Sequence, residues 1–172
     1  MSFSKEFFII DAHGFLHRNY HALPKLRTSK GEEAGALYGF VNWLIRFLKE
    51  KNPVYAAVCF DSKGPTFRHD LYQAYKANRP PTDEELISQL KIARDLVSAM
   101  GLKVVALQGA EADDLMATLA ELGRSRGEEV VIVTSDKDIY QAAGNGVKIW
   151  SGAAKDEYKS ENACLAKFNV PC

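Results

Sequence analysis

Seven of the 22 acidic residues lie at four places in this sequence, and each place follows an apolar run. Oxygen ligands from carboxylates are those that Mg²⁺ and Mn²⁺ prefer in proteins. A group of carboxylates is unfavourable on its own because like charges raise one another's pKa, and divalent cations relieve that repulsion. The candidates are Asp11, Asp61, Glu111, Asp113, Asp114, Asp136 and Asp138. We therefore predict a metal site that binds Mg²⁺ or Mn²⁺, and we call these seven residues the acidic rim.

Such a site suits the hydrolysis of phosphodiester bonds. Two ions about 3.5–4 Å apart activate a water molecule, stabilise the transition-state charge and hold the leaving oxygen. The sequence has no Ser-His-Asp arrangement, and metal-based chemistry needs none. Each acid alone has an ordinary explanation, because Asp is a favoured helix N-cap and acids suit the first turn of a helix. A plain α/β domain with a charged edge is therefore the alternative.

A basic segment over 62–81 follows one of these acids, Asp61. Its four cations against one acid give a local net charge of +3, although the whole chain is neutral. Three aromatic residues are interleaved with the cations, a pattern typical of binding to nucleic-acid strands. The cations are Lys63, Arg68, Lys76 and Arg79, and the aromatic residues are Phe67, Tyr72 and Tyr75. Positive charge next to an acidic metal site indicates a polyanionic substrate.

Five runs rich in β-branched and aromatic residues are typical of strands. They cover 7–10, 55–60, 103–107, 129–133 and 147–150. Apolar periodicity and caps predict helices between them. These helices cover about 34–50, 82–100 and 112–126, and a last helical stretch over about 160–168 follows the final strand. This alternation predicts an α/β domain, a three-layer sandwich around a mainly parallel sheet, with the acidic rim at the carboxyl ends of its strands.

Composition excludes several other classes of protein. The 22 Lys and Arg balance the 22 Asp and Glu, so no overall basic character points to nucleic acid. Cys59, Cys164 and Cys172 suggest neither a zinc site nor a disulfide framework. His17 and His21 are expected to be a pair on a surface helix rather than zinc ligands. With no secretory signal and no apolar run of membrane-spanning length, we expect a cytoplasmic protein. From its length we expect one domain over 1–172, and we also expect a monomer.

The order and spacing of these motifs resembles the 5′-nuclease domain of bacterial DNA polymerase I, in the PIN-like superfamily. No single short motif is decisive, but the ordered series covers nearly the whole chain. The matching stretches are 10–11, Arg18, 20–24, 58–64, 66–68, 75–81, 109–114 and 134–138. The resemblance implies a PIN/flap-nuclease-like fold and metal-dependent 5′–3′ exonuclease and flap endonuclease activity in DNA replication and repair.

The resemblance also implies roles for single residues. The acidic rim is similar to the family's metal ligands for two ions. Arg18, Lys76 and Arg79 are similar to cations that contact phosphate, with Lys76 and Arg79 stabilising the transition state. Tyr75 is similar to the aromatic residue at the base of a helical arch that admits single-stranded 5′ ends. The implied partners are DNA with 5′ flaps, nicks or branches, and RNA primers.

Two features depart from the family pattern. His13 lies in the Ala12–Gly14 stretch, where the family has a run of small residues, and brings an imidazole close to Asp11. Family members also continue beyond the equivalent of Pro171, with two more metal-ligating aspartates and a helix-turn-helix-type DNA-binding motif. We therefore expect this chain to be the N-terminal core of a longer domain. The alternatives are a weakly active or inactive nucleic-acid-binding module and a PIN-type ribonuclease.

Overall fold

A five-stranded sheet forms the centre of the molecule. The computed structural model describes residues 4–62, 64–153, 155 and 157–160. The strands are β1 (Ser4–Asp11), β2 (Pro53–Cys59), β3 (Lys103–Val105), β4 (Val130–Val133) and β5 (Val147–Trp150). Their order is β3-β2-β1-β4-β5, and every pairing between neighbouring strands is parallel. The predicted α/β architecture with a mainly parallel sheet is confirmed.

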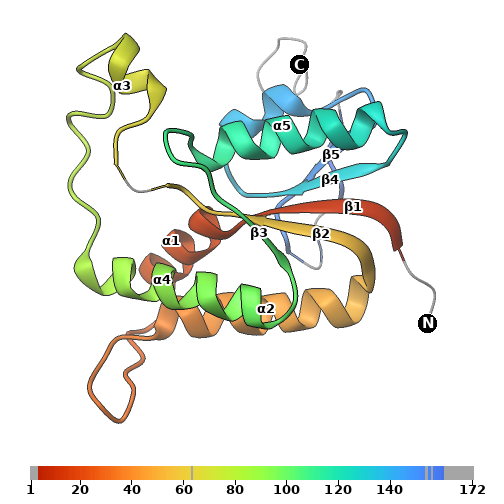
Figure 1. Ribbon diagram of the computed structural model, residues 1–172. Coiled ribbons are helices and arrows are strands. Elements are labelled where there is room, and N and C mark those ends of the chain that lie inside the picture. Colours follow the sequence, from red (N-terminus) through yellow and green to blue (C-terminus); the bar gives the residue numbers. More distant parts are fainter. Residues whose placement is uncertain (1–3, 63, 154, 156, 161–172) are drawn as a thin grey trace.

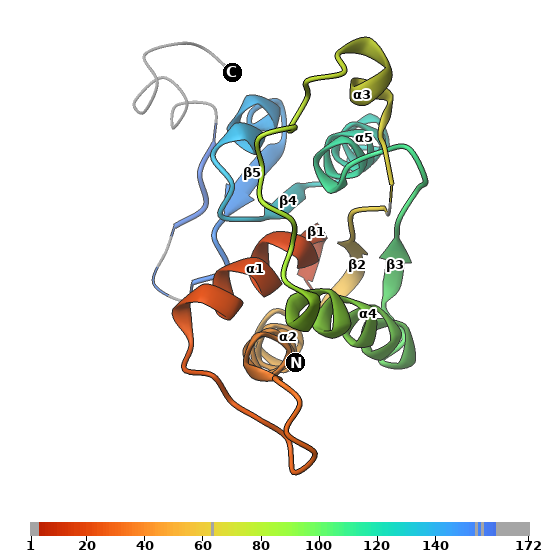
Figure 2. The same cartoon turned by 90° about the vertical axis from the view of Figure 1, so that its left-hand side faces the viewer.

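Helices cover both faces of this sheet. The helices of the described residues are α1 (Ala12–Ala22), α2 (Gly35–Lys51), α3 (Phe67–Leu71), α4 (Glu84–Ala99), α5 (Ala112–Ser125) and the 3₁₀ helix η1 (Asp138–Ala142), of which α3 lies apart from the sheet (Figure 1). Helices α1, α2 and α4 pack together on one face, and α5 packs on β1, β2 and β4 from the other (Figure 1; Figure 2). The result is the predicted three-layer sandwich. Within the described residues, no helix has the length and apolar character needed to cross a membrane.

The predicted elements agree with the structure in kind, and their ends differ by a few residues. Three further helices, α1, α3 and η1, have no counterpart in the apolar periodicity. Helix α1 buries only three side chains, and α3 buries none, so neither has an apolar stripe along its length. His17 and His21 do lie together on α1, with ring centroids 4.6 Å apart, as expected of a surface helix pair. The helix predicted over 160–168 falls, except for its first residue, outside the described residues.

Alternating side chains of the central strand enter two separate hydrophobic cores. Phe8 and Ile10 point into the core shared with α1, α2 and α4, whereas Ile9 belongs to the core under α5. All three side chains are fully buried. This two-sided burial explains the nearly continuous apolar run of β1 and fixes where its last residue, Asp11, emerges.

Removing a core side chain of α2 tests this packing. Leu44 is completely buried, and Leu44→Ala is expected to lower the free energy of unfolding by about 2–5 kcal/mol, because the cavity adds to the lost burial. Its neighbour Ile45 is 39% exposed, so Ile45→Ala is expected to cost about 1 kcal/mol or less. Urea unfolding of both variants checks the difference. Equal losses would contradict the assignment of this helix face to the core.

Candidate metal centre and nucleic-acid interface

Asp11 lies at the point where the sheet topology reverses. From β1 the chain continues to β2 on one side and returns to β4 on the other, and ligands bind at such switch points. The carboxylate is 5% exposed, and both of its oxygens accept hydrogen bonds. Gly14 N donates to Oδ1 at 2.8 Å, and Thr134 Oγ1 donates to Oδ2 at 2.7 Å. Burial raises the pKa of Asp11, although these two bonds favour its charged form.

Asp11 is the N-cap of α1, and its hydrogen bond with Gly14 N explains the glycine in the first turn of this helix. A Cβ at position 14 would lie 2.2 Å from Asp11 Oδ2, which is far inside contact distance. Any side chain there would displace the carboxylate from its place at the end of β1. Gly14 is therefore part of the site, and the sequence pattern alone gave no reason to single it out.

Asp61 follows β2 and joins the strand end to the first turn of α5. Its Oδ1 accepts a hydrogen bond of 2.7 Å from Ala112 N. Its Oδ2 lies 3.3 Å from His13 Nδ1, so the imidazole that departs from the family pattern contacts an acid of the rim. Asp61 is exposed, which leaves the carboxylate accessible for a further ligand.

Asp113 experiences the combined field of the other rim acids. Burial raises the pKa of its carboxyl to about 6, with further contributions from Asp11, Asp136, Asp61 and Glu111 in that order. The acids contributed by β1, β2 and β4 therefore lie close enough to repel Asp113. The atoms that these acids offer to a metal ion are all carboxylate oxygens, and this set of ligands fits Mg²⁺ or Mn²⁺ better than Zn²⁺.

The loop after β4 carries the last two rim acids. Asp136 N donates to Thr134 Oγ1 at 3.0 Å, and Asp138 N donates to Asp136 Oδ1 at 2.9 Å. Both side chains are exposed. Asp138 lines a cleft of about 550 Å³ between α5 and η1, together with Asp113, Glu111 and Tyr75.

Two rim acids at the start of α5 are paired with cations of the basic segment. Arg68 binds Asp114 through two hydrogen bonds of 2.7 Å, one to each carboxylate oxygen. Lys76 Nζ lies 2.7 Å from Glu111 Oε1, and Tyr75 OH donates to Glu111 Oε2 at 3.1 Å. Hydrogen bonding to Arg68 lowers the pKa of Asp114, whereas Glu111 raises the pKa of Lys76 against the opposing effect of burial. The basic segment is thus bound to the acidic rim through Asp114 and Glu111 at the start of α5.

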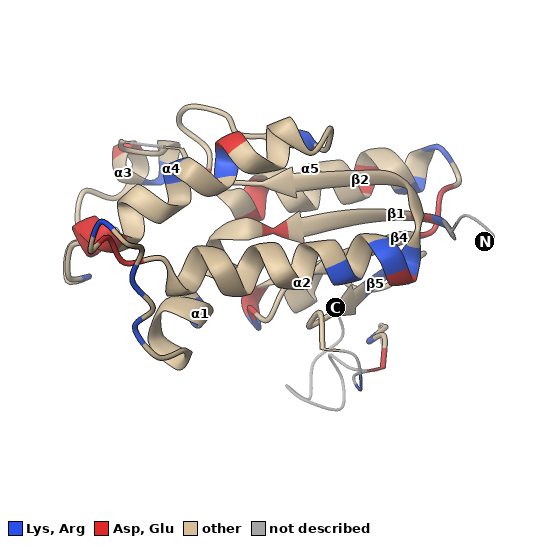
Figure 3. Ribbon diagram, turned by 90° about the horizontal axis from the view of Figure 1, so that it is seen from below, with Lys and Arg blue, Asp and Glu red and all other residues tan. Residues whose placement is uncertain are grey.

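The seven acids do not form a single ready-made ligand shell. Among the described residues, no three acidic, histidine or cysteine side chains lie close enough to hold a metal ion together. Like charges repel, and Glu111 and Asp114 are already engaged by Lys76 and Arg68. Figure 3 shows acidic positions at the tips of the central strands. The structure therefore brings the acids to one edge, and their joint ligation of metal stays a prediction.

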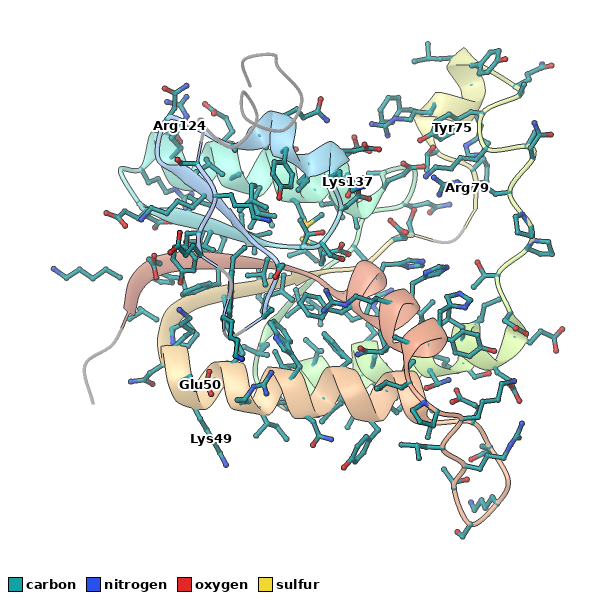
Figure 4. The ribbon with its side chains drawn as sticks, turned by 180° about the vertical axis from the view of Figure 1, so that it is seen from behind. Lys49, Glu50, Tyr75, Arg79, Arg124 and Lys137 are labelled. Carbon is teal, nitrogen blue, oxygen red and sulfur yellow. The ribbon has the colours of Figure 1, made fainter. Side chains whose placement is uncertain are left out.

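The remaining predicted nucleic-acid contacts lie around this edge. Arg18, on α1, stacks over the ring of Phe15 at 4.6 Å and is close enough to Asp11 to be affected by its charge. Arg79 is exposed and close enough to His17 to lower the pKa of that imidazole, after the larger effects of burial and the neighbouring histidines. Figure 4 places Tyr75 and Arg79 on the same side of the molecule as the strand ends. Lys63 lies outside the described residues.

Removing the Arg68 guanidinium is expected to loosen the basic segment without unfolding the domain. Arg68→Ala loses a pair worth about 1 kcal/mol, so trypsin should cut after Lys76 roughly fivefold faster. Because Arg68 lowers the pKa of Asp114, the pair stabilises the attachment above the ordinary pKa of 3.8 and is lost as pH falls through the lower folded value.

Arg124→Ala is the matched control for this proteolysis, because Arg124 pairs with Glu121 inside α5 and does not reach the basic segment. Its cleavage rate should equal that of the wild type. Unchanged proteolysis of Arg68→Ala would show that the two hydrogen bonds to Asp114 do not hold the segment.

Comparison with known proteins agrees with this geometry. Residues 6–169 match the family described as 5′-3′ exonuclease, N-terminal resolvase-like domain. DNA polymerase I of Rhizobium leguminosarum is 39% identical over 172 residues, covering 95% of this chain and 17% of the relative. The thermostable DNA polymerase I of Thermus thermophilus is 43% identical over 141 residues, or 82% of this chain and 17% of the relative. The 5′-3′ exonuclease of Aquifex aeolicus is 34% identical and covers 96% of this chain and 57% of the relative.

Solved structures share the fold at lower sequence identity. The bacteriophage T5 5′-exonuclease with bound divalent zinc ions is 20% identical with a TM-score of 0.78, covering 96% of this chain and 61% of that one. The catalytic core of Rad2 in complex with DNA is 16% identical with a TM-score of 0.59, covering 97% and 50%. This chain spans 17% of the length of the polymerases that it matches. It belongs to the 5′-3′ exonuclease family, as an N-terminal resolvase-like domain.

Proposed function

We propose that this chain is the catalytic core of a metal-dependent 5′-nuclease, which hydrolyses phosphodiester bonds at the 5′ ends and flaps of DNA. The observation that carries the proposal is the contact between the basic segment and the acidic rim. Lys76 and Arg68 reach rim carboxylates at 2.7 Å from a segment that leaves the end of β2. Cations held beside carboxylates can bind the phosphates of a strand whose backbone is cut at a bound metal.

Within the described residues, the acids of the rim fall into two groups, those that are hydrogen-bonded to a Lys or Arg of the protein and those that are not. Asp11, Asp61, Asp113, Asp136 and Asp138 would hold metal first, because the hydrogen bonds from Lys76 and Arg68 go to Glu111 and Asp114 in the described structure. Bound Mg²⁺ or Mn²⁺ supplies a nucleophilic water at neutral pH and neutralises developing negative charge. Glu111 and Asp114 would complete the ligand set once phosphate competes for Lys76 and Arg68. We propose two ions in the complete domain.

The cations and the aromatic side chain orient the nucleic acid in this proposal. The phosphates are contacted by Arg18, Lys63, Arg68 and Arg79. Lys76 and Arg79 stabilise the charge that develops on the transferred phosphate. Tyr75 offers a ring on which an unpaired base stacks, since stacking tolerates any base. This division of labour needs no protein nucleophile.

The wider role follows from the relatives and stays part of the proposal. The named relatives are DNA polymerases I and a 5′-3′ exonuclease, which fits removal of DNA flaps and RNA primers during replication and repair. DNA with 5′ flaps, nicks or branches is the proposed partner. We propose that the protein works as a monomer in the cytoplasm. The family match and these relatives do not favour a PIN-type ribonuclease or a purely binding module.

Cleavage of a labelled 5′-flap duplex tests the proposed function. Incubation with Mg²⁺ or Mn²⁺ is expected to release the flap near its junction, and excess chelator is expected to stop the reaction. An RNA flap and a 3′ flap of the same sequence distinguish ribonuclease activity and polarity. A folded protein that binds the flap in every metal condition and never cuts it would support the binding-module alternative and refute the nuclease.

A further inference from the structure

Thr134 connects two of the rim acids from a buried position. It is the first residue after β4 and is 2% exposed. Its backbone is fixed because Thr134 N donates to Trp150 O, at 2.9 Å, and so continues the pairing with β5. Its side chain lies between the end of β1 and the loop that carries Asp136. Threonine is seldom fully buried unless its hydroxyl is bonded, and here both bonds lead to the metal centre.

The hydrogen bonds of this hydroxyl have a fixed direction. The Oγ1 atom accepts from Asp136 N at 3.0 Å, and a backbone N–H can only donate. The single hydroxyl proton is then directed to Asp11 Oδ2 at 2.7 Å. Asp11 Oδ1 is held separately by Gly14 N at 2.8 Å. Two donors from opposite directions therefore fix the rotation of the Asp11 carboxylate.

We infer that Thr134 is a positioning residue for the metal centre, which sets the orientation of Asp11 and its distance from Asp136. The inference rests on the proposed function and extends it to a residue that touches neither metal nor substrate. Side chains that hydrogen-bond to metal ligands hold those ligands ready, and their loss weakens metal affinity by about 10–100-fold. Loss of the Thr134 hydroxyl would leave Asp11 Oδ2 buried without its hydrogen-bond donor. The Asp11 carboxylate could then rotate among the other acids.

A valine and a serine at this position separate orientation from packing. Thr134→Val keeps the shape and loses the hydroxyl, whereas Thr134→Ser keeps the hydroxyl and loses a methyl group. Calorimetric titration of Mn²⁺ into the full chain measures its metal affinity. This affinity is expected to weaken about 10–100-fold in Thr134→Val and to stay within about threefold of wild type in Thr134→Ser. Thr134→Ala also lacks the hydroxyl and carries the test if valine prevents folding.

Thermal melting without metal shows whether the effect is only structural. A purely structural role predicts that Thr134→Val melts at lower temperature with unchanged Mn²⁺ affinity, and this result would overturn the inference while leaving the nuclease proposal intact. Equal weakening in the valine and serine variants would also overturn it, since the methyl group would then matter as much as the hydroxyl. Absence of Mn²⁺ binding by the wild type would overturn both proposals. Weakened affinity in valine and alanine with serine near wild type supports the positioning role.

Discussion

Replacing Asp113 with asparagine is expected to reduce metal-dependent flap cleavage by about a thousandfold, equivalent to about 4 kcal/mol of transition-state stabilisation. Asp113 is the rim acid whose pKa reflects all of Asp11, Asp136, Asp61 and Glu111. It therefore lies where a cation would gain most from the surrounding negative charge. Asparagine keeps the shape and one oxygen but removes the charge that attracts the metal.

The same substitution is expected to stabilise the metal-free protein. Burial and like charges raise the pKa of Asp113 from 3.8 to about 6, so its ionisation opposes folding. That cost is fully present above about pH 6 and disappears below pH 3.8, where the side chain is protonated in both states. After allowance for solvent screening, we expect Asp113→Asn to gain on the order of 1–2 kcal/mol at pH 7.5 in chelator.

Urea unfolding at pH 7.5 and pH 3.5, with flap cleavage in Mn²⁺, measures both effects on one preparation. The matched control is Asp95→Asn, which removes an exposed acid of α4 on the far side of the sheet from α5. Asp95→Asn should leave both the free energy of unfolding and the rate of flap cleavage close to those of the wild type. Cleavage by Asp113→Asn within about threefold of wild type would remove this residue from the proposed metal centre.

Loss of the Lys76 ammonium is expected to slow cleavage by about 10²–10³-fold, the effect typical of removing one preorganised donor to a developing oxyanion. Lys76→Met keeps much of the length of the side chain without its charge. A cation that contacts phosphate also adds to the salt dependence of binding, so the slope of log affinity against log salt should fall by about one. Metal affinity should not fall, because Glu111 would lose a competing partner at 2.7 Å.

This combination separates a substrate-binding cation from a structural one. Lys91→Met, at an exposed position of α4, serves as the control and should alter neither rate nor salt slope. Single-turnover cleavage, flap binding at several salt concentrations and Mn²⁺ titration give the three readouts. Two results would contradict the role proposed for this side chain. In one, Lys76→Met cleaves the flap at the wild-type rate; in the other, it binds Mn²⁺ more weakly while its cleavage rate is unchanged.

If the proposed function holds, the ion pairs between the basic segment and α5 make metal and nucleic acid favour each other's binding. Glu111 and Asp114 cannot serve a cation of the protein and a divalent ion equally well, because each carboxylate has few lone pairs to share. Under the proposed function, metal at these acids would release Lys76 and Arg68 for phosphate, and phosphate at these cations would release the acids for metal. Thermodynamic linkage makes the two effects equal.

The sequence by itself determined the α/β class, the parallel sheet and the edge at which the acids gather. Strand and helix periodicity is a local property, and parallel strands necessarily end at a common edge. Asp11 and Asp61, each placed where a strand ends, were therefore assigned to that edge without any knowledge of tertiary structure. The extents of α1 and α3 were not predicted, and only the spacing of His17 and His21 indicated a helix there, because helices that bury so few residues carry a weak periodic signal.

Only the tertiary structure decided which partners these acids have. Thr134 and Asp11 are 123 residues apart and meet because β4 lies beside β1 in the sheet order. Arg68 and Asp114 are 46 residues apart, and they meet because the basic segment reaches the first turn of α5. Strand order and the course of the basic segment are set by packing between distant parts of the chain. Composition and spacing report local preference, so they located the acidic rim but not the hydrogen bonds that hold it.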